Sequence, residues 1–85
     1  MQSRVLNTEE RQWVEDSFRP AFNPHRYQFG EFSRGDRVEC FGRRYRVYDA
    51  DAVGFGFTLV LYGPSRYDGW SLISGVSTQD VNRIR

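Results

Sequence analysis

The chain has 85 residues, the size of one small domain, and this length leaves no room for a second independent core. Its 12 basic residues are all arginine and face 11 acidic residues, so the formal net charge is only +1. This balance excludes a strongly basic protein that coats duplex phosphate by charge alone, and it excludes an acidic tail. The absence of lysine excludes Schiff-base chemistry.

The cysteine content and the hydropathy pattern indicate a cellular compartment. Cys40 is the only cysteine, so no internal disulfide can form, as is usual in a reducing environment. The sequence has no run of 18 apolar residues, and residues 1–7 lack the apolar segment of a signal peptide. We therefore expect a cytoplasmic protein that does not enter a membrane.

The first predicted element is a helix over residues 8–18. Asn7 or Thr8 can cap its N-terminus, and Pro20 ends it because proline disfavours the helical conformation of the residue before it. One narrow apolar stripe would pack on the domain or on a second copy of the chain. The stripe consists of Trp13, Val14 and Phe18.

The helix is followed by an aromatic linker, predicted over residues 20–35, and then by segments whose apolar residues recur with a period of two. Residues 49–51 read as a polar hairpin connection between strands. Closely spaced strands after one helix predict a mainly β chain, a single domain over 1–85 with a five-stranded small barrel at 35–85. The predicted strands are 36–41, 44–48, 55–62, 70–73 and 82–84.

Two segments resemble the SH3-like small-barrel superfamily: Phe32-Ser33-Arg34-Gly35-Asp36-Arg37-Val38 and Asp80-Val81-Asn82-Arg83-Ile84. In that superfamily a Gly-Asp-x-Val strand opens the barrel, and a short 3₁₀ turn leads into the last strand. Within it, the frame resembles the plasmid-borne type II dihydrofolate reductases, which are tetramers around a pore lined by Val-Gln-Ile-Tyr. The corresponding stretch here, Leu72-Ile73-Ser74-Gly75, lacks that motif. We expect no enzymatic activity, with an oligomeric enzyme of the reductase type as a minor alternative.

The segment Gly54-Phe55-Gly56-Phe57 is similar to the core motif of RNA-recognition and cold-shock domains. Two phenylalanines on one strand face can stack on bases, and the small residues beside them let the nucleic acid approach. The alternative is that Phe55 and Phe57 fill the barrel core. A single-stranded nucleic-acid binder is therefore one functional hypothesis.

A second candidate site is a basic strand. Residues 34–46 hold five arginines against two acids, a local charge of +3. Arginine and tyrosine on one strand face can dock an acidic protein, contact phosphate, or remain a solvated surface. The candidate residues are Arg43, Arg44, Arg46 and Tyr48.

Loop aromatics form a third candidate, because SH3-like barrels commonly build their ligand groove from such residues. The groove would consist of Tyr62, Tyr67 and Trp70. The alternative is that Trp70 packs against Trp13 of the helix.

The sequence gives little support for a metal site or for a nucleophilic active site. His25 is the only histidine, so no metal cluster of the usual spacing is available, and no cofactor is expected. A pair of His25 and Cys40 is conceivable, but Cys40 shares a strand face with Val38 and is expected in the core. The leading hypothesis is a non-catalytic module, an adaptor or an inhibitor of a larger complex, that binds a protein partner.

Overall fold

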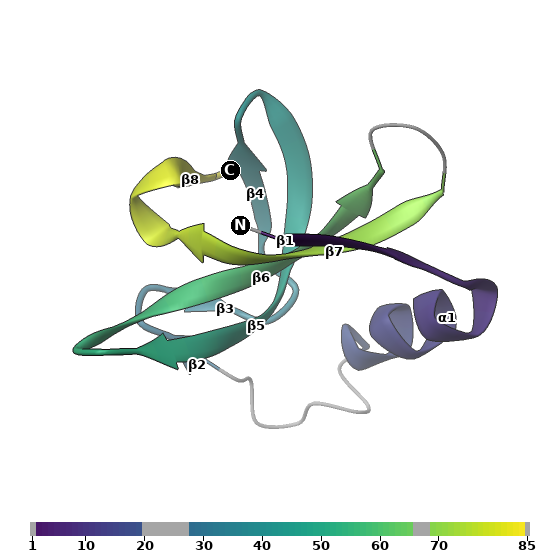
Figure 1. Cartoon of the computed structure of the whole chain (residues 1–85), viewed down its shortest axis with the longest axis horizontal. Helices are drawn as coiled ribbons and strands as arrows, with labels where there is room; N and C mark the ends of the chain where they lie inside the picture. The colour runs from purple at the N-terminus through teal and green to yellow at the C-terminus, as the bar shows by residue number, and fades with distance from the viewer. Residues whose placement is uncertain (1, 20–27, 66–68, 85) are drawn as a thin grey trace.

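The computed structural model describes residues 2–19, 28–65 and 69–84. Its architecture is mainly β, with one antiparallel sheet of six strands, a separate two-stranded hairpin and one N-terminal helix (Figure 1). The sheet consists of β1 Gln2–Leu6, β4 Arg37–Cys40, β5 Arg43–Val53, β6 Gly56–Pro64, β7 Trp70–Ser77 and β8 Val81–Arg83. The hairpin consists of β2 Gln28–Phe29 and β3 Phe32–Ser33, and the helices are α1 Thr8–Ser17 and the 3₁₀ helix η1 Thr78–Asp80.

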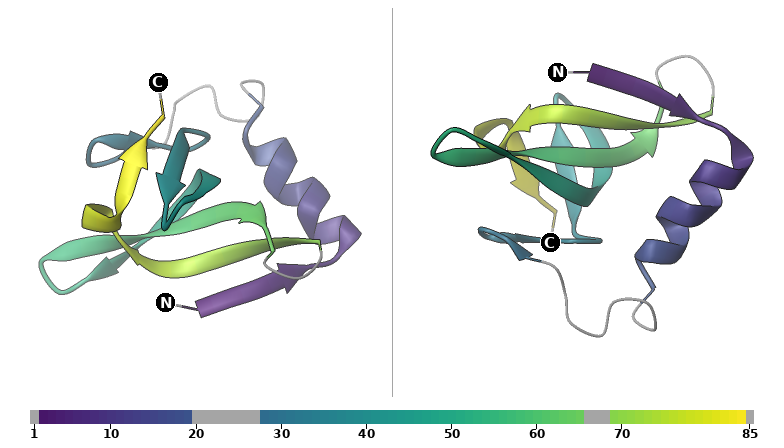
Figure 2. Two further views of the ribbon diagram at one scale, coloured as in Figure 1. Left: turned by 90° about the horizontal axis from the view of Figure 1, so that it is seen from above. Right: turned by 60° about the horizontal axis from the view of Figure 1, so that its bottom comes forward.

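The strand order in the sheet is β1-β7-β6-β5-β4-β8. Strands β4 to β7 form an antiparallel meander, after which η1 reverses the chain so that β8 pairs with β4. Within the described residues β1 and β8 each have one neighbour, so the sheet is twisted and open (Figure 2). This open six-stranded sheet replaces the predicted five-stranded closed arrangement.

Strand β1 is a sheet strand that the sequence prediction missed, in addition to the short strands β2 and β3. It pairs with β7 from Gln2 opposite Ser74 to Leu6 opposite Trp70. Four of its five side chains are exposed, so it lacks the apolar alternation by which a half-buried strand is found in a sequence. The backbone pairing with β7, a strand almost 70 residues later, therefore defines this element.

The helix begins as predicted and ends one residue earlier. The side chain of Asn7 accepts a hydrogen bond from the backbone N–H of Glu10 at 2.8 Å, and the Glu10 side chain accepts one from the Asn7 N–H at 3.2 Å. This reciprocal capping box satisfies two backbone donors that the first turn leaves unpaired. Phe18 forms the C-cap.

The two faces of the sheet bury two separate clusters, because successive side chains of a strand point to opposite sides. The inner cluster lies on the concave face and consists of Phe32, Val38, Cys40, Tyr45, Val47, Leu59, Leu61, Val76 and Val81. The outer cluster lies under α1 and consists of Leu6, Val14 and Tyr62, with Phe18, Tyr48, Trp70 and Leu72 packed against it. Thus Leu61 and Tyr62, adjacent in β6, belong to different cores.

The helix stripe is only partly as predicted. Val14 is buried and Phe18 is half-buried, but the Trp13 side chain is 64% exposed. Adjacent helical residues point about 100° apart, and here Val14 faces the sheet while Trp13 points away from it. Trp70 accordingly stacks on Tyr62, not on Trp13.

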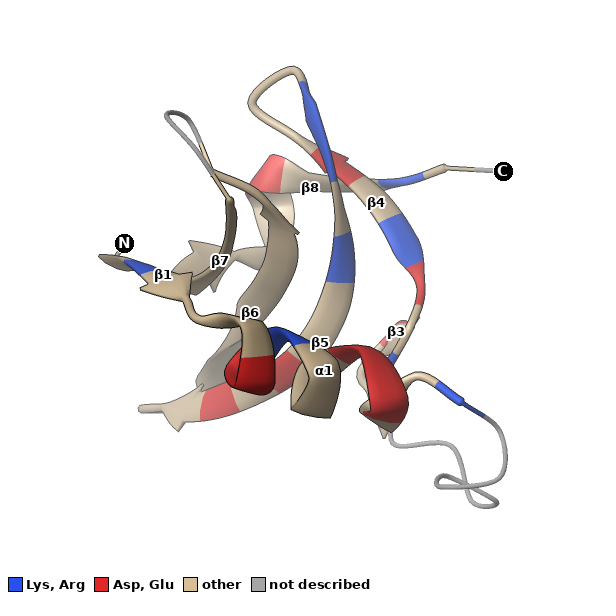
Figure 3. Ribbon diagram, turned by 90° about the vertical axis from the view of Figure 1, so that its right-hand side faces the viewer, with Lys and Arg blue, Asp and Glu red and all other residues tan. Residues whose placement is uncertain are grey.

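Two predictions for the β5–β6 hairpin are wrong. Residues 49–51 are not a connection but part of β5, which continues through a register shift after Val47 and reaches Val53. Phe55 is not a core residue; it lies in the turn and is fully exposed, whereas Phe57 packs against the inner cluster. The far half of this hairpin, which carries the acidic part of β5 (Figure 3), extends beyond the rest of the sheet (Figure 1). Asp51 is exposed there, whereas Asp49 is half-buried and forms an ion pair with Arg34 at 3.9 Å.

Part of the predicted linker lies outside the described residues, and so do His25 and Tyr67. The described remainder, 28–35, contains the β2–β3 hairpin, whose Phe32 belongs to the inner cluster. Neither helix in the described part of the chain has the length and apolar character needed to cross a membrane.

Candidate binding cleft

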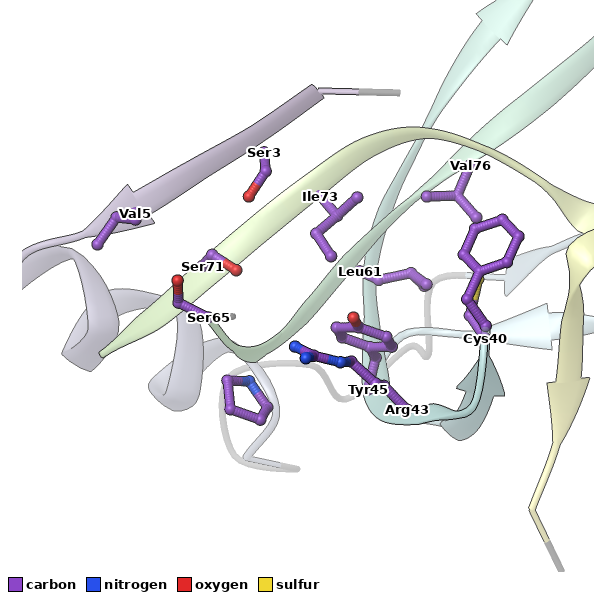
Figure 4. A pocket seen from close by; sticks show the side chains of 12 residues that line it. Ser3, Val5, Cys40, Arg43, Tyr45, Leu61, Ser65, Ser71, Ile73 and Val76 are labelled. Atoms are coloured by element: carbon purple, nitrogen blue, oxygen red, sulfur yellow. The ribbon is translucent and has the colours of Figure 1, made fainter. Parts of the chain in front are cut away.

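The concave face of the sheet opens into a cleft of about 470 Å³ between β1 and the β4–β5 hairpin (Figure 4). Its floor is made by apolar side chains of β6 and β7, and its opposite walls come from β1 and β5. The lining residues are Ser3, Val5, Cys40, Phe41, Arg43, Tyr45, Leu61, Pro64, Ser65, Ser71, Ile73 and Val76. Among the residues that the structure describes, no acidic side chain lines the cleft.

The Tyr45 ring forms one wall of the cleft, and Gly63 positions it. A Cβ atom at Gly63 would lie 2.2 Å from Cδ1 and 2.8 Å from Cε1 of Tyr45. No side chain can therefore stand at position 63 while the ring keeps its place. The ring lies over the bare backbone of β6, which leaves the space in front of it open.

The rim of the cleft carries an aromatic side chain in a strained turn. Cys40 pairs with Arg43, so Phe41 and Gly42 form a two-residue turn, with φ values of 52° and 76°. Such turns favour asparagine, aspartate or glycine, and a left-handed conformation costs other residues about 1–2 kcal/mol. Phe41 is 65% exposed, so burial within this chain does not offset the strain.

The charge at this rim is positive. Arg43 and Arg44 are both exposed, and among the described residues neither forms an ion pair. Glu39 stands opposite Arg44 in the β4–β5 register, whereas Arg43 borders the cleft itself. Burial, with a smaller effect of the Asp80 charge, raises the pKa of the Cys40 thiol, which keeps it protonated and unreactive.

Arg46 and Tyr48, which the sequence analysis grouped with Arg43, pack against Phe18 at the end of α1. The Arg46 guanidinium lies 4.3 Å from the centre of the Phe18 ring, and its Nε donates to the Gly35 carbonyl at 3.2 Å. Burial, followed by the charge of Arg37, lowers the pKa of Arg46. Tyr48 also packs edge-on against Phe18, at 6.3 Å between ring centres. The predicted basic face therefore divides into an exposed tip and a part that holds α1.

The predicted aromatic groove is occupied by the helix. Tyr62 and Trp70 stack with ring centres 5.1 Å apart, but Tyr62 is only 2% exposed. Its hydroxyl donates to Glu15 at 3.1 Å and accepts from Arg11 at 3.4 Å, and the Arg11 guanidinium covers Trp70 at 4.8 Å. Burial raises the pKa of Tyr62, with a further contribution from Glu15. These rings face α1 and do not offer a groove to a ligand.

The cleft was not found from the sequence, although one signal was present. The sequence Phe41-Gly42 stands where a two-residue hairpin turn normally has Asn-Gly. A large apolar residue that is unfavourable in such a turn indicates that the turn belongs to a binding site. The exposed Val5 gave no signal, because β1 itself was not predicted.

No protein-family model, no curated protein and no solved structure matches the chain. Among the described residues, no three His, Cys, Asp or Glu side chains are grouped so that they could hold a metal ion. The function is therefore inferred from the cleft and its rim alone.

Proposed function

We propose that the protein is a non-catalytic binding module whose cleft accepts an apolar side chain of a protein partner, with acidic groups of that partner beside Arg43. The observation that carries this proposal is Phe41, an aromatic residue held in a left-handed turn and exposed at the mouth of an apolar cleft. Strain of this kind persists where the surrounding structure enforces it, and it concentrates at binding sites.

The size and chemistry of the cleft support a protein segment as the ligand. Pockets of about 300–1,000 Å³ with mostly apolar walls and a few polar groups are typical binding sites, and this cleft lies within that range. Arginine and aromatic residues are the side chains that most often dominate protein interfaces. Here Phe41, Arg43 and Tyr45 supply both kinds within one hairpin.

We also propose that the sheet is a small barrel of the SH3-like type that is open at the seam between β1 and β8. The supporting feature is the path of the chain: a four-stranded meander, a 3₁₀ turn, and a last strand that returns to the first strand of the meander. In this arrangement β1 and α1 are additions at the other edge of the meander.

The alternative of a single-stranded nucleic-acid binder requires its stacking and phosphate-binding residues on one surface. Arg43 and Arg44 lie at the start of β5, whereas Phe55 follows its end, so the two groups sit at opposite ends of a long strand. Phe57 packs against the inner cluster and offers little of its ring for stacking. The geometry favours a protein ligand at the arginine end.

A titration of ¹⁵N-labelled protein tests the proposal, with a capped hexapeptide containing Asp-Phe-Asp as the probe and the Asp-Ala-Asp peptide as its control. We expect amide shifts at Val5, Phe41, Arg43 and Ser71 with the first peptide only. Arg43→Glu should weaken binding at least tenfold. Arg44→Glu, on the other strand face, should change it less than threefold.

Shifts confined to α1 or to the β5–β6 hairpin would refute the cleft as the binding site. A single-stranded oligonucleotide in place of the peptide provides the second arm. The proposal would give way to nucleic-acid binding if the oligonucleotide shifted the amide signals of the protein at physiological salt while the peptide shifted none.

A further inference from the structure

We propose that the cleft is filled by the β5–β6 hairpin of a second copy of this chain, so that copies associate head to tail. This inference rests on the proposed function of the cleft and names its partner. The hairpin turn at Gly54-Phe55 supplies the apolar side chain, and the β4–β5 turn with Arg43 supplies the receiving rim.

The hairpin has the form of an inserting element. Phe55 is fully exposed at its turn and Val53 beside it is 58% exposed, so two large apolar side chains project together into solvent. A Cβ atom placed at Gly54 or Gly56 would meet nothing within 4 Å, which shows that the tip stands clear of the rest of the chain. A single aromatic anchor in a pocket is the usual centre of a protein interface.

The charges of the two ends are complementary. Strand β5 begins with Arg43, which borders the cleft, and carries the exposed Asp51 near its other end, on the projecting hairpin (Figure 3). Asp51 is exposed and, among the described residues, forms no ion pair. Inserting the hairpin of one copy into the cleft of another therefore brings the Asp51 carboxylate of the first copy toward the Arg43 guanidinium of the second.

One chain cannot make this contact with itself. Both turns flank β5, and the ten steps from Arg43 to Val53, at about 3.3 Å each, make a path of about 33 Å along the strand between them. The contact is thus between different surfaces of two copies, which closes into a ring or continues as a chain. A hairpin tip buries less surface than the roughly 1,200 Å² typical of stable interfaces, so association should be weak and concentration-dependent.

Analytical ultracentrifugation of the full chain from 10 µM to 1 mM, with two variants, tests this proposal. Phe55→Ala removes the inserting side chain, and Arg43→Glu disables the cleft. We expect the wild type to gain mass with concentration and each variant alone to weaken association at least tenfold. Trp13→Ala, which removes another exposed aromatic side chain, should associate like the wild type.

Mixing the two variants gives the sharper readout. Phe55→Ala keeps an intact cleft and Arg43→Glu keeps an intact hairpin, so an equimolar mixture should form a one-to-one dimer that grows no further. A wild type that stays monomeric at 1 mM, or that loses association through Trp13→Ala, would overturn the head-to-tail contact. If the Asp-Phe-Asp peptide still shifts the cleft amides of a monomeric protein, the proposed function stands and only its partner is wrong.

Discussion

The close approach of Gly63 to Tyr45 gives a prediction whose size follows from the structure. In Gly63→Ala the new methyl group would lie 2.2 Å from Tyr45 Cδ1, whereas carbon atoms in contact stay about 3.5–4.0 Å apart. The ring must therefore move by more than about 1 Å, and Arg44 O at 3.2 Å limits the movement of the methyl group itself. Overpacking of this kind costs about 1–3 kcal/mol, and we expect a loss of about 2 kcal/mol.

Urea unfolding followed by tryptophan fluorescence measures this loss. With a urea dependence near 1 kcal/mol/M for a small domain, the midpoint should fall by about 2 M. Gly56→Ala is the matched control, because its methyl group would meet nothing within 4 Å, and it should stay within about 0.5 kcal/mol of the wild type. In a Tyr45→Val background the cost of Gly63→Ala should shrink by at least about 1 kcal/mol, since the ring it displaces is gone.

The result that refutes this reasoning is an equal effect of Gly63→Ala and Gly56→Ala on the free energy of unfolding. The same substitution also tests the cleft, because the direction open to the displaced ring is the cleft itself. Gly63→Ala should therefore weaken binding of the Asp-Phe-Asp peptide even under conditions where the variant is fully folded.

Three further predictions concern the turn, the helix and its contact with the sheet. Phe41→Asn should raise the free energy of unfolding by about 1 kcal/mol through relief of turn strain, yet reduce peptide binding; a stability loss in chemical unfolding would contradict this. Burial raises the pKa of Tyr62, so its contribution to stability is complete below the ordinary tyrosine pKa and is lost as pH rises through the raised value. Between pH 8 and pH 11 the free energy of unfolding should therefore fall less in Tyr62→Phe than in the wild type. An equal fall in both proteins would contradict this prediction. Asn7→Ala removes the helix cap and should cost about 1 kcal/mol in thermal or urea unfolding, whereas exposed Asn82→Ala should cost almost nothing.

The helix and the meander could be predicted because their signals are local. Asn7 and Pro20 mark the ends of a helical pattern, and Val38, Tyr45 and Leu61 stand at positions where a period of two requires a buried side chain. The residues of the proposed binding site could be predicted only in part. Arg43 and Arg44 are exposed, which the sequence left open, while Arg46 and Tyr62, two other predicted binding residues, lie beneath α1.

The sequence by itself determined which residues can be helical, which alternate as strands, and that Cys40 belongs to a core. Only the tertiary structure decided that β1 joins the sheet at its edge, which face α1 covers, and that Val5 and Tyr45 meet across one cleft. The physical reason is that the period of apolar residues indicates whether a side chain is buried, but it does not indicate which other segment the side chain packs against. The choice of partner depends on contacts between distant segments, whose combined burial and hydrogen bonding exceed any local preference.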